Sequence, residues 1–173
     1  MVNNYEIELK IQDTSGEADL TNRFKSRFSK PSWYKKRNLK IVFTLNANVN
    51  PNIHTFLTSG GIGDNENKIG LQIDGGEIKA VCSNGFASQE ILYQVDNIEM
   101  QFKAEIDFIP DEVCNIKLYD YVNENLLGEA NLINNLPHGL SEAENCFHFR
   151  VVTIYDTSQI RSLTVSQVIY SQT

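Results

Sequence analysis

The longest regular pattern in this chain is an eleven-residue alternation of apolar and polar side chains, from Ile98 to Phe108. Neighbouring side chains of a β-strand point to opposite faces of a sheet, so this pattern predicts a strand with one buried face. The alternation ends before Pro110, which lacks the backbone N–H that a central strand needs. Shorter alternations of the same kind begin at Tyr5 and at Leu39.

Ten further segments carry a strand signal and are bounded by Gly, Asn, Asp or Pro. They span residues 5–11, 39–45, 55–59, 68–74, 77–82, 91–95, 115–122, 126–130, 147–155 and 163–170. Two of them meet at Gly75-Gly76, a pair that supplies the positive φ of a tight hairpin. Eleven short strands at close spacing predict an all-β fold, a two-sheet antiparallel β-sandwich of the jelly-roll type, rather than alternating strands and helices.

Residues 12–38 carry no strand signal of this kind. A short helix near residues 17–28 is one interpretation, because Leu20, Phe24 and Phe28 recur at the spacing of a helical face. An extended loop across a sheet face is the alternative. We expect the whole chain, residues 1–173, to form a single β-sandwich domain that carries this segment as a basic loop or short-helix insertion.

The charges of the chain are unevenly distributed. The net charge is −7, yet residues 1–40 carry nine Lys and Arg against five Asp and Glu. Residues 23–40 form a basic segment in which cations alternate with aromatic rings. The docking candidates in this segment are Arg23, Lys25, Arg27, Lys35, Lys36 and Arg37.

This basic segment has three interpretations. Cations beside aromatic rings suit a polyanion such as nucleic acid, and they equally suit an acidic neighbouring subunit. The third interpretation is a solvated face of the protein's own fold. No RNP, KH or helix-turn-helix pattern accompanies the segment, so we do not expect nucleic acid as the partner.

Six pieces of the chain follow one another in a characteristic order of hairpins. They are Thr55–Gly60, Ile69–Ile73, Gly76–Ala80, the strand that ends at Phe108, the hairpin Lys117–Glu129 and the closing segment Leu163–Tyr170. In this order they resemble the concanavalin A-like lectin and laminin G-like jelly-roll superfamily, over about residues 39–170. The resemblance implies a jelly-roll sandwich. The superfamily includes lectins, carbohydrate-binding modules, adhesion domains, glycosidases and virion or tail proteins.

The carboxylate pair Glu105 and Asp107 in the long strand is the sharpest enzymatic signal. Glucanases of the superfamily that the chain resembles use Glu-x-Asp-x-Glu, in which the last glutamate is the general acid. Here Ile109 stands at the position of that glutamate, or Pro110 if the strand is bulged. Without a general acid the leaving group is not protonated, so we predict a non-enzymatic protein rather than a glycoside hydrolase.

Aromatic side chains are the candidates for sugar binding, because their rings stack on the apolar faces of pyranoses. These candidates are Trp33, Tyr34, Tyr119 and Tyr121. Trp33 and Tyr34 lie in the basic segment. Tyr119 and Tyr121 occupy alternate positions that face outward in the predicted strand 115–122. The alternatives are a Trp33 ring packed beneath the N-terminal loop and cross-strand packing of the two later tyrosines.

Two polar stretches, Asp64–Asn67 and Asp120–Glu124, offer oxygen ligands of the kind that calcium binds. Calcium needs about six to eight converging oxygens, and both stretches also have the composition of ordinary turns. We therefore expect no metal or other cofactor. If Ca²⁺ does bind, Asp64 and Glu66 are the candidate ligands.

The three cysteines, Cys82, Cys114 and Cys146, are widely separated and form no CxxC or Cys/His cluster. This pattern argues against a disulfide framework and against a zinc site. We expect small, partly buried side chains, with a reactive thiol as the alternative.

No stretch approaches the roughly 20 apolar residues of a membrane span, and the first residues lack the pattern of a secretion signal. We therefore expect synthesis in a cytoplasm without membrane insertion, and a place in a virion. The predicted function is non-enzymatic recognition of a glycan or cell surface within a homo-oligomer or larger assembly such as a phage particle. The alternative is a purely structural protein that docks a partner subunit through residues 23–40.

Overall fold

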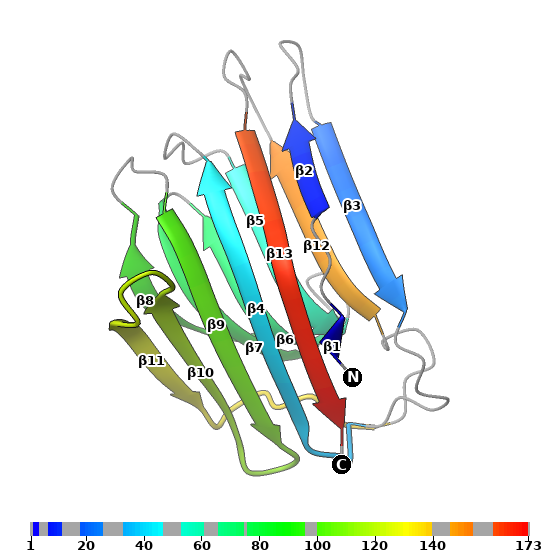
Figure 1. Ribbon diagram of the computed structural model, residues 1–173. Coiled ribbons are helices and arrows are strands. Elements are labelled where there is room, and N and C mark those ends of the chain that lie inside the picture. Colours follow the sequence, from blue (N-terminus) through cyan, green and yellow to red (C-terminus); the bar gives the residue numbers. More distant parts are fainter. Residues whose placement is uncertain are drawn as a thin grey trace.

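The computed structural model consists of two antiparallel β-sheets (Figure 1). The residues that it describes are 2–3, 7–11, 18–25, 33–46, 53–60, 66–74, 76–95, 100–139, 146–153 and 161–172. Within these ranges there are thirteen strands and no helix, so no helix long and apolar enough to cross a membrane is found among them.

The larger sheet has seven strands. Six of them follow the order β1–β13–β4–β9–β10–β11, and β2 pairs with the same edge of β13 as β1 does. The strands are β1 (Val2–Asn3), β2 (Ile7–Ile11), β4 (Arg37–Asn46), β9 (Met100–Ile109), β10 (Val113–Asp120), β11 (Leu126–Leu132) and β13 (Arg161–Gln172).

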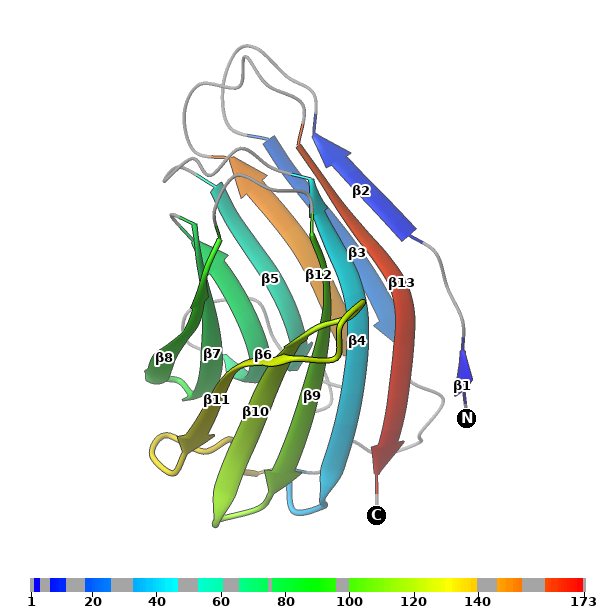
Figure 2. The same ribbon diagram turned by 60° about the vertical axis from the view of Figure 1, so that its left-hand side comes forward.

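The smaller sheet has six strands in the order β3–β12–β5–β6–β7–β8. They are β3 (Ala18–Lys25), β5 (Ile53–Gly60), β6 (Asn67–Asp74), β7 (Glu77–Asn84), β8 (Ala87–Gln94) and β12 (Cys146–Thr153). Figure 2 shows the two sheets as facing layers. The edge strands β8 and β11 contact each other, which closes the sandwich along one side.

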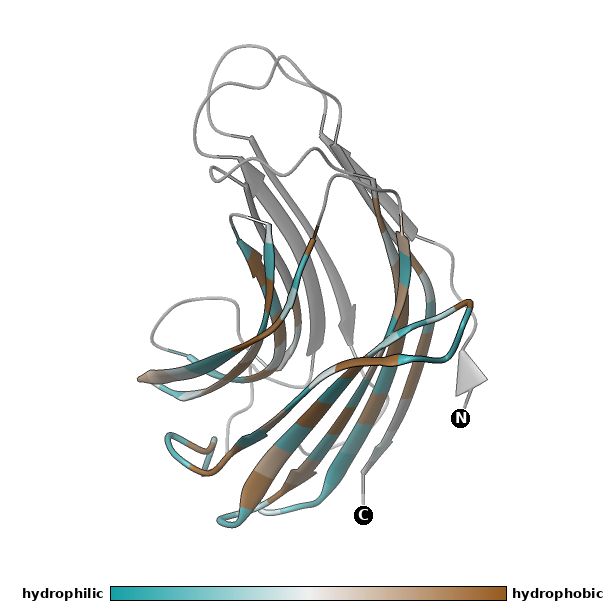
Figure 3. Cartoon of the chain, turned by 90° about the vertical axis from the view of Figure 1, so that its left-hand side faces the viewer, coloured by the Kyte–Doolittle hydropathy of each residue, from teal (hydrophilic) through white to brown (hydrophobic). Residues whose placement is uncertain are grey.

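The core lies between the two sheets. Its residues in β9 are Phe102, Ala104, Ile106 and Phe108, and the residues between them are at least partly exposed. Alternate residues of β4 from Leu39 to Leu45 are buried as well. Figure 3 shows the resulting alternation of hydrophobic and hydrophilic positions along the strands. Full burial of a large apolar side chain contributes about 1.5–3 kcal/mol, so these inner faces hold the two sheets together.

The prediction of a two-sheet antiparallel β-sandwich is confirmed, and each of the eleven predicted segments overlaps a strand. The hairpin predicted at Gly75-Gly76 is present, because Asp74 pairs with Glu77 across it and Gly76 has a φ of 83°. A residue with a Cβ is strained at such a φ, which explains the glycine. The long strand ends at Ile109, directly before the proline.

The expectation of a short helix near residues 17–28 is wrong, because Ala18–Lys25 forms strand β3. All eight residues of β3 pair with β12. The spacing of four residues between Leu20 and Phe24 is close to one helical turn, but it is also two periods of a strand. The sequence pattern therefore fits both structures, and the pairing partner decides between them. Residues 26–32 lie outside the described residues.

The segment 133–139, which follows β11, is tied to both sheets. The Asn135 side-chain amide donates a hydrogen bond to Ser88 Oγ of β8, at 3.0 Å. The Trp33 backbone N–H, just before β4, donates to the Gly139 carbonyl oxygen at 3.3 Å. The bond to Gly139 ties the chain at Trp33, just before β4, to this segment.

Gly128 of β11 marks the close approach of the two edge strands. A Cβ added to Gly128 would lie 2.2 Å from the Leu92 carbonyl oxygen of β8. We therefore expect Gly128→Ala to lower the free energy of unfolding by about 1–3 kcal/mol, because the backbone of β8 must move. Urea unfolding followed by circular dichroism measures this loss.

The control for this substitution is Leu126→Ala, at an exposed position of the same strand. We expect it to change the free energy of unfolding by no more than about 0.5 kcal/mol. An equal loss in both variants would contradict the proposed backbone contact.

Candidate functional site

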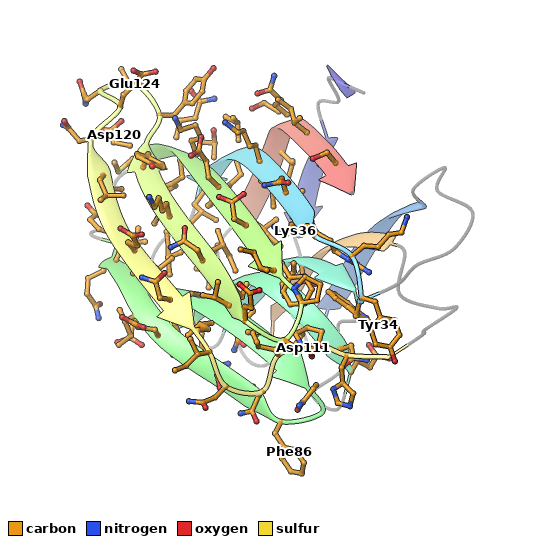
Figure 4. The ribbon with its side chains drawn as sticks, turned by 90° about the horizontal axis from the view of Figure 1, so that it is seen from below. Tyr34, Lys36, Phe86, Asp111, Asp120 and Glu124 are labelled. Carbon is orange, nitrogen blue, oxygen red and sulfur yellow. The ribbon has the colours of Figure 1, made fainter. Side chains whose placement is uncertain are left out.

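The five residues from Trp33 to Arg37 lead into β4 and are divided between core and surface. Trp33 and Arg37 are each 1% exposed, whereas Tyr34 is 63% exposed and both Lys35 and Lys36 are exposed. Figure 4 shows Tyr34 and Lys36 at the end of the sandwich that faces the viewer. We refer to Tyr34–Lys36 as the basic turn, which presents one aromatic ring and two cations between two buried residues.

The two buried residues pack against each other. The guanidinium carbon of Arg37 lies 3.7 Å from the centroid of the Trp33 ring, an attractive cation–π contact. Phe108 meets the same ring edge-on, with 5.6 Å between the centroids and 87° between the planes. A Cβ added to Gly60 would lie 2.9 Å from Trp33 Cζ2. These contacts fix both ends of the basic turn.

The lysines of the basic turn differ from those on the sheets. Four lysines on the sheets lie close to carboxylates, in the pairs Lys40–Glu105 at 2.9 Å, Lys79–Glu77 at 3.0 Å, Lys103–Glu105 at 3.7 Å and Lys117–Glu129 at 3.5 Å. In the part of the chain that the structure describes, neither Lys35 nor Lys36 forms an ion pair. Among the described side chains, the basic turn thus presents two exposed cations that lie against no carboxylate.

The structure separates residues that the sequence places in one basic segment. Trp33 is buried, so of the two interpretations of its ring the packed one fits the structure, and the ring is not an open platform for sugar. Arg37 is also buried, so its guanidinium is not offered to a docking partner. Arg23 and Lys25 lie on β3, where only the backbone is described, and Arg27 lies outside the described residues.

The other aromatic candidates lie at the end of β10. Tyr119 is partly buried, and Lys103 Nζ lies 4.4 Å from the centroid of its ring. This contact covers one face of the ring. Tyr121 is 43% exposed, and its backbone N–H donates a hydrogen bond to the Gln101 carbonyl oxygen at 2.9 Å. Tyr121 is therefore the more accessible of the two tyrosines.

The carboxylate pair of β9 faces outward from the larger sheet, on the same side as Ile109. Glu105 accepts a hydrogen bond from Lys40 Nζ at 2.9 Å, and Asp107 accepts one from the Asn38 amide. The bond from Lys40 holds the pKa of Glu105 below its ordinary value, against the opposing effect of burial. The general acid of the glucanase motif would stand at Ile109, whose side chain has no proton to donate.

The candidate calcium ligands do not converge among the described residues, where no group of three metal-binding side chains occurs. Asp64 lies outside those residues, and Glu66 is exposed. In the second stretch, Asp120 accepts hydrogen bonds from the Asn123 side chain at 2.6 Å and from the Val122 N–H at 2.9 Å. The bonds from Asn123 lower the pKa of Asp120, whose carboxylate thus caps its own turn.

Cys82 and Cys114 are free thiols in the core. The neighbouring Cys82 thiol, together with burial, raises the pKa of Cys114 well above its ordinary value. A thiol that stays protonated is a poor nucleophile, so Cys114 is not suited to chemistry. The side chain of Cys146, on β12, is not among those described.

No protein-family model and no curated protein matches this sequence. Solved structures do match. A protein of unknown function from Shewanella oneidensis MR-1 has a TM-score of 0.59 at 10% identity, over 99% of this chain and 88% of that chain. A β-glucanase from Bacillus licheniformis has a TM-score of 0.54 at 14% identity, over 96% and 78%. Botulinum neurotoxin type C has a TM-score of 0.59 at 10% identity, over 95% and 43%.

These similarities concern the fold. The toxin binding domains and the β-glucanase are concanavalin A-like jelly rolls, and this chain has that fold too. The resemblance expected from the order of hairpins is therefore confirmed at the level of the fold. The chain spans less than half the length of the toxin chains, with 43% of the type C chain covered.

The Lys40–Glu105 pair makes stability depend on pH. Because the folded pKa of Glu105 is lowered, the pair stabilises the protein above the unfolded pKa, and this contribution is lost as pH falls through the folded pKa. We expect the free energy of unfolding to fall less between about pH 7 and about pH 3 in Glu105→Gln than in the unaltered protein. Urea titrations at both pH values measure the difference.

Lys40→Gln removes the other partner of the pair and should weaken the pH dependence in the same direction. An unaltered pH dependence in both variants would show that the pair contributes nothing to it.

The contact between Arg37 and Trp33 should stabilise the fold. We expect Arg37→Met, which keeps an unbranched stem but removes the guanidinium, to lower the free energy of unfolding by about 1–3 kcal/mol. Trp33 is the only tryptophan in the chain, so its fluorescence reports both the unfolding and the environment of the ring. Lys40→Met, on the exposed side of β4, is the control and should cost no more than about 1 kcal/mol. If Arg37→Met and Lys40→Met lowered the free energy of unfolding equally, the contact between Arg37 and Trp33 would not be stabilising.

Proposed function

We propose that this chain is a carbohydrate-binding module without catalytic activity, and that its ligand contacts the basic turn. The observation that carries the proposal is the exposed Tyr34 ring on a turn fixed between Trp33 and Arg37. An exposed tyrosine stacks on the apolar face of a pyranose while its hydroxyl stays hydrated. A turn that is already fixed loses little conformational entropy when a ligand binds.

Proteins with the same fold support this class of ligand. Botulinum neurotoxin type C interacts with two ganglioside molecules, and the binding domain of botulinum neurotoxin DC has been solved in complex with SialylT. The DC domain has also been solved with rat synaptotagmin II. These ligands belong to the toxins, and they make glycan the first class to test here and protein the second.

Hydrolysis is the competing function, because the β-glucanase of Bacillus licheniformis has the same fold. Against hydrolysis, Ile109 stands on the outward face of β9 where a third carboxylate would follow Glu105 and Asp107. Both of these carboxylates accept hydrogen bonds from β4. The roles in a phage particle and as a subunit-docking protein stay predictions.

A glycan array probed with the full chain tests the proposal. We expect binding to a subset of glycans, and we expect Tyr34→Ala to weaken it by at least about tenfold, equivalent to the loss of about 1.4 kcal/mol. The physical reason is that the stacking surface for the sugar ring is removed.

Tyr121→Ala is the matched control, because it removes an exposed tyrosine at the end of β10, outside the basic turn. It should leave the affinity within about twofold. Absence of binding to every glycan would refute the proposed function. A loss in Tyr121→Ala but not in Tyr34→Ala would move the site to the end of β10.

A further inference from the structure

The two lysines of the basic turn indicate which kind of glycan binds. We infer that the basic turn binds an anionic saccharide, with a carboxylate or sulfate of the sugar held by Lys35 and Lys36 and a sugar ring against Tyr34. This inference rests on the proposed function, because it names the chemical class of the ligand at the same site.

The first argument is the charge that the basic turn leaves uncompensated. Lys35 and Lys36 are adjacent and exposed, and within the described ranges neither lies against a carboxylate. Neighbouring like charges repel each other, and an anion bound between them removes this repulsion. Lys40 and Lys117 do not offer the same opportunity, since each already pairs with a glutamate.

The second argument is the contrast between the basic turn and the rest of the protein. The net charge of −7 means that most of the surface repels an anion, which confines binding to a local positive site. The start of β4 pairs with the end of β9, so the exposed Asp111 and Glu112 lie at the same end as the basic turn. Figure 4 shows Asp111 there together with Tyr34 and Lys36.

These carboxylates favour a short ligand over a polymer. A long polyanion that extended from the basic turn toward Asp111 and Glu112 would be repelled there. Nucleic acid also gains affinity with the number of phosphates it contacts, and the two lysines of the basic turn supply few such contacts by themselves. A saccharide with one or two anionic groups is short enough to contact the basic turn without reaching Asp111 and Glu112.

The third argument concerns how the cations are presented. A lysine ammonium is a compact charge with three donors on a flexible stem, so it adapts to the oxygens of either a carboxylate or a sulfate. The backbone beneath the two lysines is fixed by the Arg37–Trp33 stack, 3.7 Å from guanidinium carbon to ring centroid. The basic turn thus combines a fixed position with adjustable charges, which suits anionic groups of different shapes.

Calorimetric titration of the full chain with four probes tests the inference: sialyllactose, a hyaluronan tetrasaccharide, sulfated lactose and uncharged lactose. We expect at least one acidic probe to bind at least about tenfold more tightly than lactose at low salt. The first two probes carry carboxylates and the third a sulfate, so the pattern identifies the anion. Added NaCl should weaken the preferred probe, because salt screens exposed charges.

The decisive variant is Lys35→Gln combined with Lys36→Gln, which should abolish the preference for the acidic probe. Lys117→Gln is the matched control, since it removes a lysine paired with Glu129 on the sheet, and it should leave the affinity within about twofold. Circular dichroism of each variant verifies the fold.

The outcomes separate the inference from the proposed function. Equal affinity for acidic and neutral probes, or full binding by the double variant, would overturn the inference. The proposed function would survive in that case if Tyr34→Ala still weakened binding. If no saccharide binds, both fail, and binding of poly-glutamate through the same lysines would then assign the basic turn to protein docking.

Discussion

The burial of one face of each sheet against the other is the interaction on which the rest of the molecule depends. It requires alternate residues of the inner strands to be apolar, and β9 and β4 satisfy this requirement along most of their lengths. The contact continues past the sheets at one end, where Phe108 of β9 meets Trp33 in the segment that precedes β4. The core therefore includes Trp33, and its packing fixes the segment that precedes β4.

This extension of the core is what creates the candidate site. Trp33 and Arg37 are withdrawn from water, and the three residues between them are left on the surface. Neighbours in the sequence therefore have opposite roles, since the buried pair positions the basic turn and the exposed Tyr34 and lysines remain able to contact a ligand. The larger sheet offers no comparable group of free cations among its described side chains, because Lys40 and Lys117 pair with glutamates on neighbouring strands and Lys103 lies near a glutamate of its own strand.

The sequence predicted the sheets better than the site, for physical reasons. A strand with one buried face repeats every two residues, so β4 and β9 were visible as alternations, whereas the spacing in Ala18–Lys25 fitted both helix and strand. A turn has no period, so the sequence left open whether the Trp33 ring is packed or exposed, and it did not show that Tyr34 is exposed. The pairing of Lys40 with Glu105 depends on the register of β4 with β9, which local sequence does not specify. The sequence did indicate that Lys40 and Glu105 each lie on the outward face of their strand, but not that they lie side by side.

Strand β13 lies inside the larger sheet, between β4 and the strands β1 and β2. Its residues pair with partners far away in the sequence, as Val168 does with Ile41. Closing such long loops costs entropy and slows folding. Until β13 has been synthesised, the edge of β4 that receives it stays open, and open strand edges pair readily with other chains. A translation product that stops before β13 is therefore expected to aggregate. The larger sheet can be completed only after the last strand has been synthesised.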